Sequence, residues 1–264
     1  MNLLKKLAKS AWVSRAQQDV VPLKDIVYIG STYQGYYVPS NYLTSTSICY
    51  CVGAGTDISL DVELATRFKS QVFILDPMPY AKQHFDDLVR SVKEGKVFTA
   101  DNKKEGYVYK ISAKELGAIT YCATGVWDEK KIVKFYVPAS DNYAGHSITN
   151  LQKTEDYIEA PVDKLVNIMR ELGHQQIDLL KIEIEGSEYT VIDDVLADKL
   201  DVKMILVEFD EFHHRKRLSR LVAIKHIEQS SRKLKKAGYK LVHSISFYKR
   251  TFIRADIMAK LATS

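Results

Sequence analysis

From residue 47 onward, short apolar runs alternate regularly with longer amphipathic stretches, and no other sequence feature constrains the fold as strongly. The predicted strands cover residues 47–52, 71–75, 119–123, 132–137, 177–185 and 202–209. The predicted helices cover residues 58–68 (with Asp57 as N-cap), 80–93, 161–172 and 187–196, and a basic helix ends at Gly238. Residues 239–245 and 247–258 form a closing hairpin. Such alternation indicates an α/β fold, with a parallel sheet, helices on both faces and an antiparallel edge.

The first 46 residues follow a different pattern. Leu3 to Val13 has a helical period with lysines on the other side, so it either packs on the main domain or lies on a membrane surface. A tyrosine-rich stretch then predicts strands and turns; its members are Tyr28, Tyr33, Tyr36, Tyr37, Tyr42 and Tyr50. These side chains either line a site for a sugar or another flat substrate or cover the sheet. We therefore expect an N-terminal helix and aromatic-rich extension over residues 1–46 and one α/β domain over residues 47–264.

The composition is that of a globular protein. The 264 residues are 46% hydrophobic and 27% charged, and no apolar run approaches the roughly 20 residues of a membrane span. The first residues lack the pattern of a secretory signal. Cys49 and Cys51 are too close for a relaxed disulfide, and with Cys122 they form no zinc-binding spacing. These features predict a cytoplasmic protein without a metal.

Positive charge is concentrated in one segment. Residues 213–240 hold ten Lys or Arg and one acid, a net +9; because the whole chain carries +5, the rest carries −4. This distribution is not typical of a nucleic-acid-binding protein. It indicates either the solvated face of a helix, with Leu218, Leu221, Val222 and Leu234 as its buried stripe, or contact with an anionic ligand or membrane.

A candidate cofactor site follows the first two predicted strands. The sequence Gly53-Ala54-Gly55-Thr56-Asp57 comes after the first strand, and Asp76-Pro77 comes after the second. Glycines allow close backbone approach, and an acid about 20 residues further on suits the hydroxyls of a ribose. A dinucleotide site needs a third glycine, where this chain has Ile58. A cofactor with a ribose and no phosphates, S-adenosyl-L-methionine, therefore fits better than a nicotinamide dinucleotide.

Several motifs together resemble the FkbM-type S-adenosylmethionine-dependent methyltransferases. They are Tyr50-Cys-Val-Gly-Ala-Gly-Thr-Asp-Ile-Ser-Leu-Asp, Phe73-Ile-Leu-Asp-Pro-Met-Pro, Gly125-Val-Trp-Asp, His146-Ser-Ile and Ile177-Asp-Leu-Leu-Lys-Ile-Glu-Ile-Glu-Gly-Ser-Glu-Tyr. The resemblance implies a class I methyltransferase (Rossmann-like) fold, a seven-stranded, mostly parallel sheet with an antiparallel last strand. It also implies O-methylation of a hydroxyl on a sugar or small metabolite.

Two positions depart from the family pattern. Cys51 stands where an acid is common, and Glu183 stands where Asp is common. The loss of the acid at position 51 supports an alternative hypothesis, a non-catalytic binding or scaffold protein on this fold. A nucleotide-dependent oxidoreductase is a further alternative.

The predicted cofactor-binding residues are Gly53, Ala54, Gly55, Thr56, Asp57, Asp76, Pro77, Gly125 and Val126. Trp127 either stacks on the adenine or packs in the core. The predicted catalytic residues are Glu183, Glu208 and His146, with His213 and His214 as alternative bases.

Glu183 and Glu185 have the same strand parity as Lys181, which predicts one face for all three side chains. These three residues either form a Lys–Glu network that fixes the strand end, or Glu183 contacts the cofactor or the acceptor while Glu185 braces the turn at Gly186.

Overall fold

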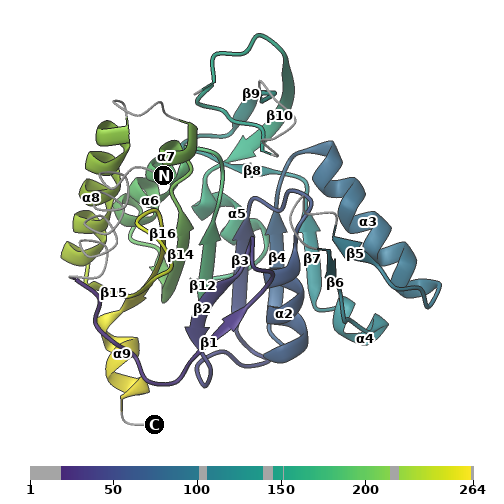
Figure 1. Cartoon of the computed structure of the whole chain (residues 1–264), viewed down its shortest axis with the longest axis horizontal. Helices are drawn as coiled ribbons and strands as arrows, with labels where there is room; N and C mark the ends of the chain where they lie inside the picture. The colour runs from purple at the N-terminus through teal and green to yellow at the C-terminus, as the bar shows by residue number, and fades with distance from the viewer. Residues whose placement is uncertain (1–18, 101–105, 139–144, 151, 215–219, 263–264) are drawn as a thin grey trace, which may run out of the picture.

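The computed structural model describes residues 19–100, 106–138, 145–150, 152–214 and 220–262 (Figure 1). The helix predicted over residues 3–13 lies outside this range. Within it, no helix combines the length and apolarity that crossing a bilayer requires.

A seven-stranded sheet forms the centre of the molecule (Figure 1). In spatial order its strands are β15 (Tyr239–Ser244), β16 (Lys249–Arg254), β14 (Met204–Glu208), β12 (Leu179–Ile182), β3 (Ile48–Val52), β4 (Gln71–Leu75) and β7 (Ile119–Cys122). The five strands from β14 to β7 are parallel to their neighbours, whereas β16 runs antiparallel to both β14 and β15. The sheet is therefore mixed, and the antiparallel last strand expected from the closing hairpin is confirmed.

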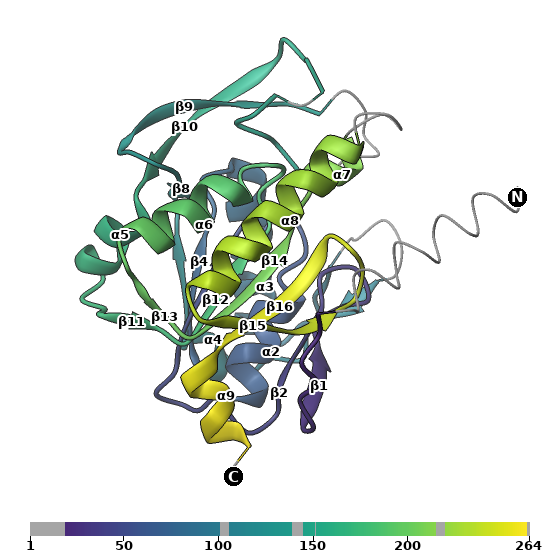
Figure 2. The same ribbon diagram turned by 90° about the vertical axis from the view of Figure 1, so that its left-hand side faces the viewer.

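Helices cover both faces of the sheet. They are α2 (Ser59–Arg67), α3 (Pro79–Lys93), α4 (Ala113–Leu116), α5 (Leu165–Glu171), α6 (Glu188–Ala197), α7 (Glu211–His214), α8 (Arg220–Lys236) and α9 (Ala255–Leu261). Side chains of α2 and α3 belong to one buried cluster and those of α5, α6 and α8 to another. Helices α6 and α8 lie side by side (Figure 2).

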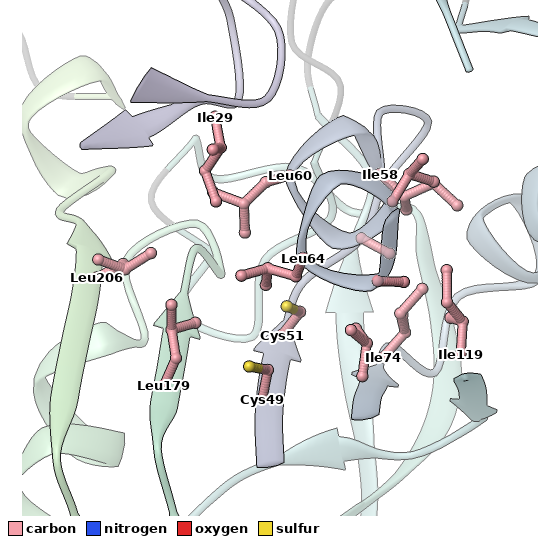
Figure 3. Packing of buried hydrophobic residues seen from close by; sticks show 14 of the residues in the cluster. Ile29, Cys49, Cys51, Ile58, Leu60, Leu64, Ile74, Ile119, Leu179 and Leu206 are labelled. Carbon is pink, nitrogen blue, oxygen red and sulfur yellow. The ribbon is translucent and has the colours of Figure 1, made fainter. Parts of the chain in front are cut away.

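Side chains of β3 point alternately to the two faces of the sheet and so contribute to both core clusters. Cys49 and Cys51 point into the first cluster, beside Leu64 and Leu179, as Figure 3 shows, while Tyr50 and Val52 point into the second. All four side chains are at most 1% exposed, as expected for a central strand covered on both sides. The three cysteines are free thiols.

Four smaller sheets flank the central one. They are the hairpin β1 (Ile26–Ile29) with β2 (Tyr36–Pro39), the pair β5 (Thr99–Ala100) with β6 (Tyr107–Val108), the pair β11 (Gln176–Ile177) with β13 (Asp201–Val202), and a three-stranded sheet of β8 (Gly125–Val126), β10 (Tyr157–Asp163) and β9 (Lys131–Tyr136). The strands β9 and β10 project beyond the main sheet in Figures 1 and 2.

The tyrosine-rich segment forms strands and turns, as predicted. Tyr36 and Tyr50 are fully buried and pack in the core. Ile29, Tyr36 and Val38 of the β1–β2 hairpin join the first core cluster. A domain boundary between residues 46 and 47 stays a prediction.

Two predicted elements were wrong in part. Residues 161–163 end strand β10 and do not begin a helix, because they pair with β9 and β8; helix α5 starts at Leu165. Here pairing with distant strands overrides the local helical pattern. At the other end of the chain, β16 stops at Arg254, and residues 255–258 of the predicted hairpin begin helix α9.

The stripe predicted for the basic helix was also wrong in part. Leu234 is fully buried, but Leu221 and Val222 are exposed, and Leu218 lies outside the described residues. The buried face of α8 consists of Ala223, Ile224, Ile227, Ser230, Ser231 and Leu234.

Candidate active site

A cavity of about 210 Å³ opens where four neighbouring parallel strands end. Strands β3, β4, β12 and β14 lead into it through Gly53, Asp76, Glu183 and Glu208. All nine predicted cofactor-binding residues and all three predicted catalytic residues line this cavity. Residues spread between positions 53 and 208 thus come together at one cavity, and their roles stay predictions.

The loop after β3 has a conformation that requires glycine at its first position. Gly53 has φ +85°, and a Cβ there would lie 1.9 Å from the carbonyl oxygen of Glu183. The Gly53 N–H donates to the Leu75 carbonyl at 3.0 Å, and the Gly53 carbonyl accepts from Lys181 Nζ at 2.6 Å. The loop is thus held between the ends of β4 and β12.

Asp57 connects this loop to helix α2 and to the N-terminal hairpin. Its Oδ1 accepts from the Ser59 N–H at 3.0 Å, and its Oδ2 accepts from the Ser31 hydroxyl at 2.7 Å. The N-cap of α2 is Ile58 and not Asp57 as predicted, although the Asp57 carboxylate still satisfies an N–H of the first turn.

Asp76 is 5% exposed and lies under the same loop. Its Oδ2 accepts from the N–H groups of Ala54 at 2.8 Å and Gly55 at 3.1 Å, and its Oδ1 accepts from Met78 N–H at 2.8 Å. Burial raises the pKa of this carboxyl, and the three N–H donors oppose that shift. Asp76 therefore already fixes the loop, and its contact with a ribose stays a prediction.

Residues of β8 and β9 form one wall of the cavity. Gly125 and Val126 are buried there beside Phe135. Trp127 is not among the lining residues and packs against the first core cluster, which favours the core-packing alternative for that side chain.

His146 and Tyr80 face each other across one side of the cavity, with ring centroids 5.1 Å apart. The His146 Nδ1 is buried and has no hydrogen-bond partner among the described residues. Burial lowers the pKa of His146, and the charges of Asp76 and Glu185 oppose that shift. The imidazole is therefore disposed to be neutral near pH 7.

Glu183 sits between two buried lysines. Its Oε2 lies 2.9 Å from Lys181 Nζ, and its Oε1 lies 3.3 Å from Lys249 Nζ. Burial raises the pKa of Glu183 to about 7, against the lowering effect of both lysines. The Lys–Glu network inferred from strand parity is present, and Glu183 also lines the cavity, so the two alternatives are compatible.

Glu208 shares Lys249 with Glu183, at a shorter distance of 2.7 Å from Oε2 to Nζ. Although burial acts to raise it, the pKa of Glu208 falls below its usual value because the Lys249 charge and hydrogen bonds to the carboxylate dominate. Glu208, the carboxylate nearer to Lys249, therefore keeps its charge, whereas Glu183 takes up a proton more readily.

The shared strand face predicted for Glu183 and Glu185 was wrong. Strand β12 ends at Ile182, and Glu185 has φ +55°, an uncommon conformation for a residue other than glycine. The Glu185 carbonyl accepts from the Ser147 hydroxyl at 2.6 Å, and its N–H donates to Asp210 Oδ2 at 3.2 Å. Glu183 and Glu185 both line the cavity because the chain turns after β12, and not because they share one face of a strand.

The acid missing at position 51 has a counterpart on helix α2. Asp61 is 1% exposed, and it interacts electrostatically with Lys181 and with the buried thiol of Cys51. Burial raises the pKa of Asp61, and Lys181 lowers it. Lys181 therefore has a second acidic neighbour besides Glu183, and this neighbour, Asp61, belongs to α2. The sequence pattern did not predict that Asp61 lies near Lys181.

Sequence reasoning missed Asp210 and Lys249. Asp210 lines the cavity, and burial together with Glu185, Glu188 and Glu208 raises its pKa well above the usual value. Lys249 is brought to Glu208 by the antiparallel pairing of β16 with β14. The Glu-x-Asp pattern at the end of β14 was the available signal for Asp210. His213 is not a lining residue, and the side chain of His214 lies outside the described residues.

Comparison with known proteins places this site in a family. Residues 33–241 match the methyltransferase FkbM domain, so the chain belongs to the FkbM methyltransferase family. Among solved structures, it is similar to a methyltransferase FkbM from Methylobacillus flagellatus KT, with 13% identity and a TM-score of 0.45 over 80% of this chain and 44% of that one. This chain thus spans less than half the length of that protein. A search of curated proteins found no match.

Proposed function

We propose that this chain is an S-adenosyl-L-methionine-dependent methyltransferase of the class I type that methylates a hydroxyl of a sugar or small metabolite. The observation that supports it most directly is the cavity at the strand ends, which brings the Gly53–Asp57 loop, Asp76 and the carboxylates of Glu183 and Glu208 together. Family membership supports the same reaction class. The order of the central strands, with an antiparallel strand inserted beside β14, supports the class I type.

The chain's own residues suit the cofactor in this pocket. Asp76 has three N–H donors on its two oxygens, and carboxylate oxygens can accept further bonds from ribose hydroxyls. Gly125, Val126 and Phe135 form an apolar wall for the adenine. When bound, the cofactor supplies a methyl group on a positively charged sulfur.

Methyl transfer to a hydroxyl requires alignment and removal of a proton. The cavity walls would hold the acceptor oxygen in line with the methyl carbon and sulfur, and this alignment accounts for most of the rate gain. Glu183 is the carboxylate we assign to receive the proton, with His146 and Glu208 at the same cavity.

The acceptor is proposed to be a small hydroxylated molecule or glycan and not a nucleic acid. Among the described residues, the cavity lining contains no Lys or Arg that would bind phosphates. It contains six acidic residues: Asp57, Asp76, Glu183, Glu185, Glu208 and Asp210. We further propose that the protein acts in a reducing compartment such as the cytoplasm, consistent with its free thiols.

Calorimetry with S-adenosylmethionine and S-adenosylhomocysteine tests the proposed function. We expect both to bind the full chain and Asp76→Ala to weaken binding at least about tenfold, because the substitution removes a charged hydrogen-bond acceptor worth roughly 1.5–3 kcal/mol.

Asp86→Asn on the exposed face of α3 is the matched control and should bind as the wild type does, since the half-exposed Asp86 pairs with Lys82 on the surface. The absence of binding of either compound to the wild-type protein would refute the proposal. Binding of NAD in their place would favour an oxidoreductase.

A further inference from the structure

Three potential metal ligands converge where β14 ends. Glu208 is the last residue of the strand, Asp210 lies in the turn that follows, and His213 belongs to the single turn of α7. One ligand atom from each side chain lies within 4.8 Å of the other two. The turn is closed by the His213 N–H, which donates to the Asp210 carbonyl at 2.9 Å.

The Glu208 carboxylate is oriented by a lysine. Lys249 Nζ binds Oε2 at 2.7 Å, and the other oxygen, Oε1, lies 3.5 Å from His213 Nε2. The His213 ring packs edge-on against Tyr248, with centroids 4.3 Å apart. One oxygen of Glu208 and one nitrogen of His213 are therefore held facing each other.

Asp210 offers an oxygen without a donor. The residue is more than nine-tenths buried and lines the cavity, and its Oδ2 accepts from the Glu185 N–H. Within the described chain, no residue donates a hydrogen bond to Oδ1, and no cationic side chain pairs with this carboxylate. One oxygen of Asp210 is therefore open to a ligand that enters from the cavity.

We propose that Glu208, Asp210 and His213 bind a divalent cation of the Mn²⁺ type at the rim of the cavity. Two carboxylate oxygens with one imidazole nitrogen form a ligand set that such ions accept. Around an octahedral ion with bonds of about 2.1 Å, opposite ligand atoms are about 4.2 Å apart and neighbouring ones about 3 Å. Side-chain rotations would bring the three atoms to such distances from their separations of at most 4.8 Å.

The two buried lysines near this site contact Glu183 and Glu208 and not Asp210. Four carboxylates lie together at this edge with two buried lysines: Glu183, Glu188, Glu208 and Asp210 with Lys181 and Lys249. Both lysines already contact Glu183, and Lys249 also contacts Glu208. Asp210 therefore has no cationic partner among the described residues, and a cation bound there would not displace either lysine.

The role of the ion rests on the proposed function. A hydroxyl bound to a divalent cation loses its proton more easily than a free hydroxyl. With the cofactor bound, Glu183 would receive the proton while the acceptor oxygen bonds to the methyl carbon, and the sulfur would keep the electron pair of the broken carbon–sulfur bond. This role assigns the acceptor to the side of the cavity that Glu183, Glu208 and Asp210 line.

Titration of the full chain with Mn²⁺, followed by the electron paramagnetic resonance signal of the free ion, tests the site. We expect one ion per chain in the wild type and affinity at least about tenfold weaker in Asp210→Asn and in His213→Ala. Because the His213 side chain is 40% exposed, His213→Ala should fold normally even if Asp210→Asn does not. The matched control is Asp193→Asn on α6, whose carboxylate contacts Lys233 on the surface.

Wild-type affinity for Mn²⁺ in His213→Ala, or no bound Mn²⁺ in the wild type, would overturn the cation site. Calorimetry with S-adenosylhomocysteine in the presence of a chelator separates this result from the proposed function. If the cofactor product binds without Mn²⁺ binding, the cation site is wrong and the proposed function stands. If Mn²⁺ binds and the cofactor product does not, the site stands and its assigned role is wrong.

Discussion

At the scale of single residues, the sequence predicted groups whose role depends on their local neighbours. Gly53 and Asp76 were found because a turn after one strand and an acid after the next are local patterns. Lys249 was missed because nothing near it in the chain indicates Glu183 or Glu208 as partners; that contact depends on the register between β16 and β14. Buried ion pairs of this kind are determined by tertiary structure.

Glu188 gives a residue-scale prediction for pH-dependent stability. The side chain is fully buried, its Oε1 accepts from the N–H groups of Ile184 and Gly186, and its Oε2 has no partner among the described residues. Burial raises its pKa from 4.5 to about 8. Between these values the folded protein binds a proton that the unfolded chain releases, so the free energy of unfolding falls as pH rises.

Glu188→Gln removes this titration and keeps an oxygen for both N–H donors. We expect the difference in free energy of unfolding, variant minus wild type, to increase by about 1–3 kcal/mol between pH 5 and pH 8 in urea denaturation. The exposed Glu159→Gln should show no such trend. An equal difference at both pH values for Glu188→Gln would mean that Glu188 is ionised in the folded protein.

At the scale of elements, hydrophobic period located the strands and helices of the central sheet but not all their ends. Strand β4 was predicted residue for residue, since its apolar run is bounded by polar residues. Residues 161–163 were assigned to a helix, whereas pairing with β8 and β9 makes them strand. Local periodicity cannot contain information about partners at other positions of the chain.

Helix α8 carries much of the positive charge and gives the element-scale prediction. Lys233 lies 2.7 Å from Asp193, and Lys235 lies 2.6 Å from Asp19, so two of its cations are paired on the surface. Each free Lys or Arg adds about 1 kcal/mol to binding at an anionic surface. We expect the full chain to remain in the supernatant when sedimented with anionic liposomes at physiological salt. Co-sedimentation that disappears at high salt would contradict this expectation and assign the basic segment to a membrane.

At the scale of the whole molecule, alternation of elements predicted an α/β sheet covered on both faces, and the structure confirms it. The positions of β8, β9 and β10 could not be predicted, because these strands form a separate sheet, in which β8 and β9 provide one wall of the cavity. The meeting of the predicted residues at one cavity could be predicted, since parallel strands bring their carboxyl ends to one edge. The meeting of distant strand ends therefore followed from the fold class, whereas the wall formed by β8 and β9 did not.

A crystal structure of the full chain with S-adenosylhomocysteine is the most direct test of the proposed function. We predict the ribose hydroxyls within hydrogen-bond distance of the Asp76 carboxylate, the adenine beside Val126 and Phe135, and the sulfur directed toward Glu183 and Glu208. Binding of the cofactor product outside this cavity, or a ribose without contact to Asp76, would contradict the assignment of this cavity as the cofactor site.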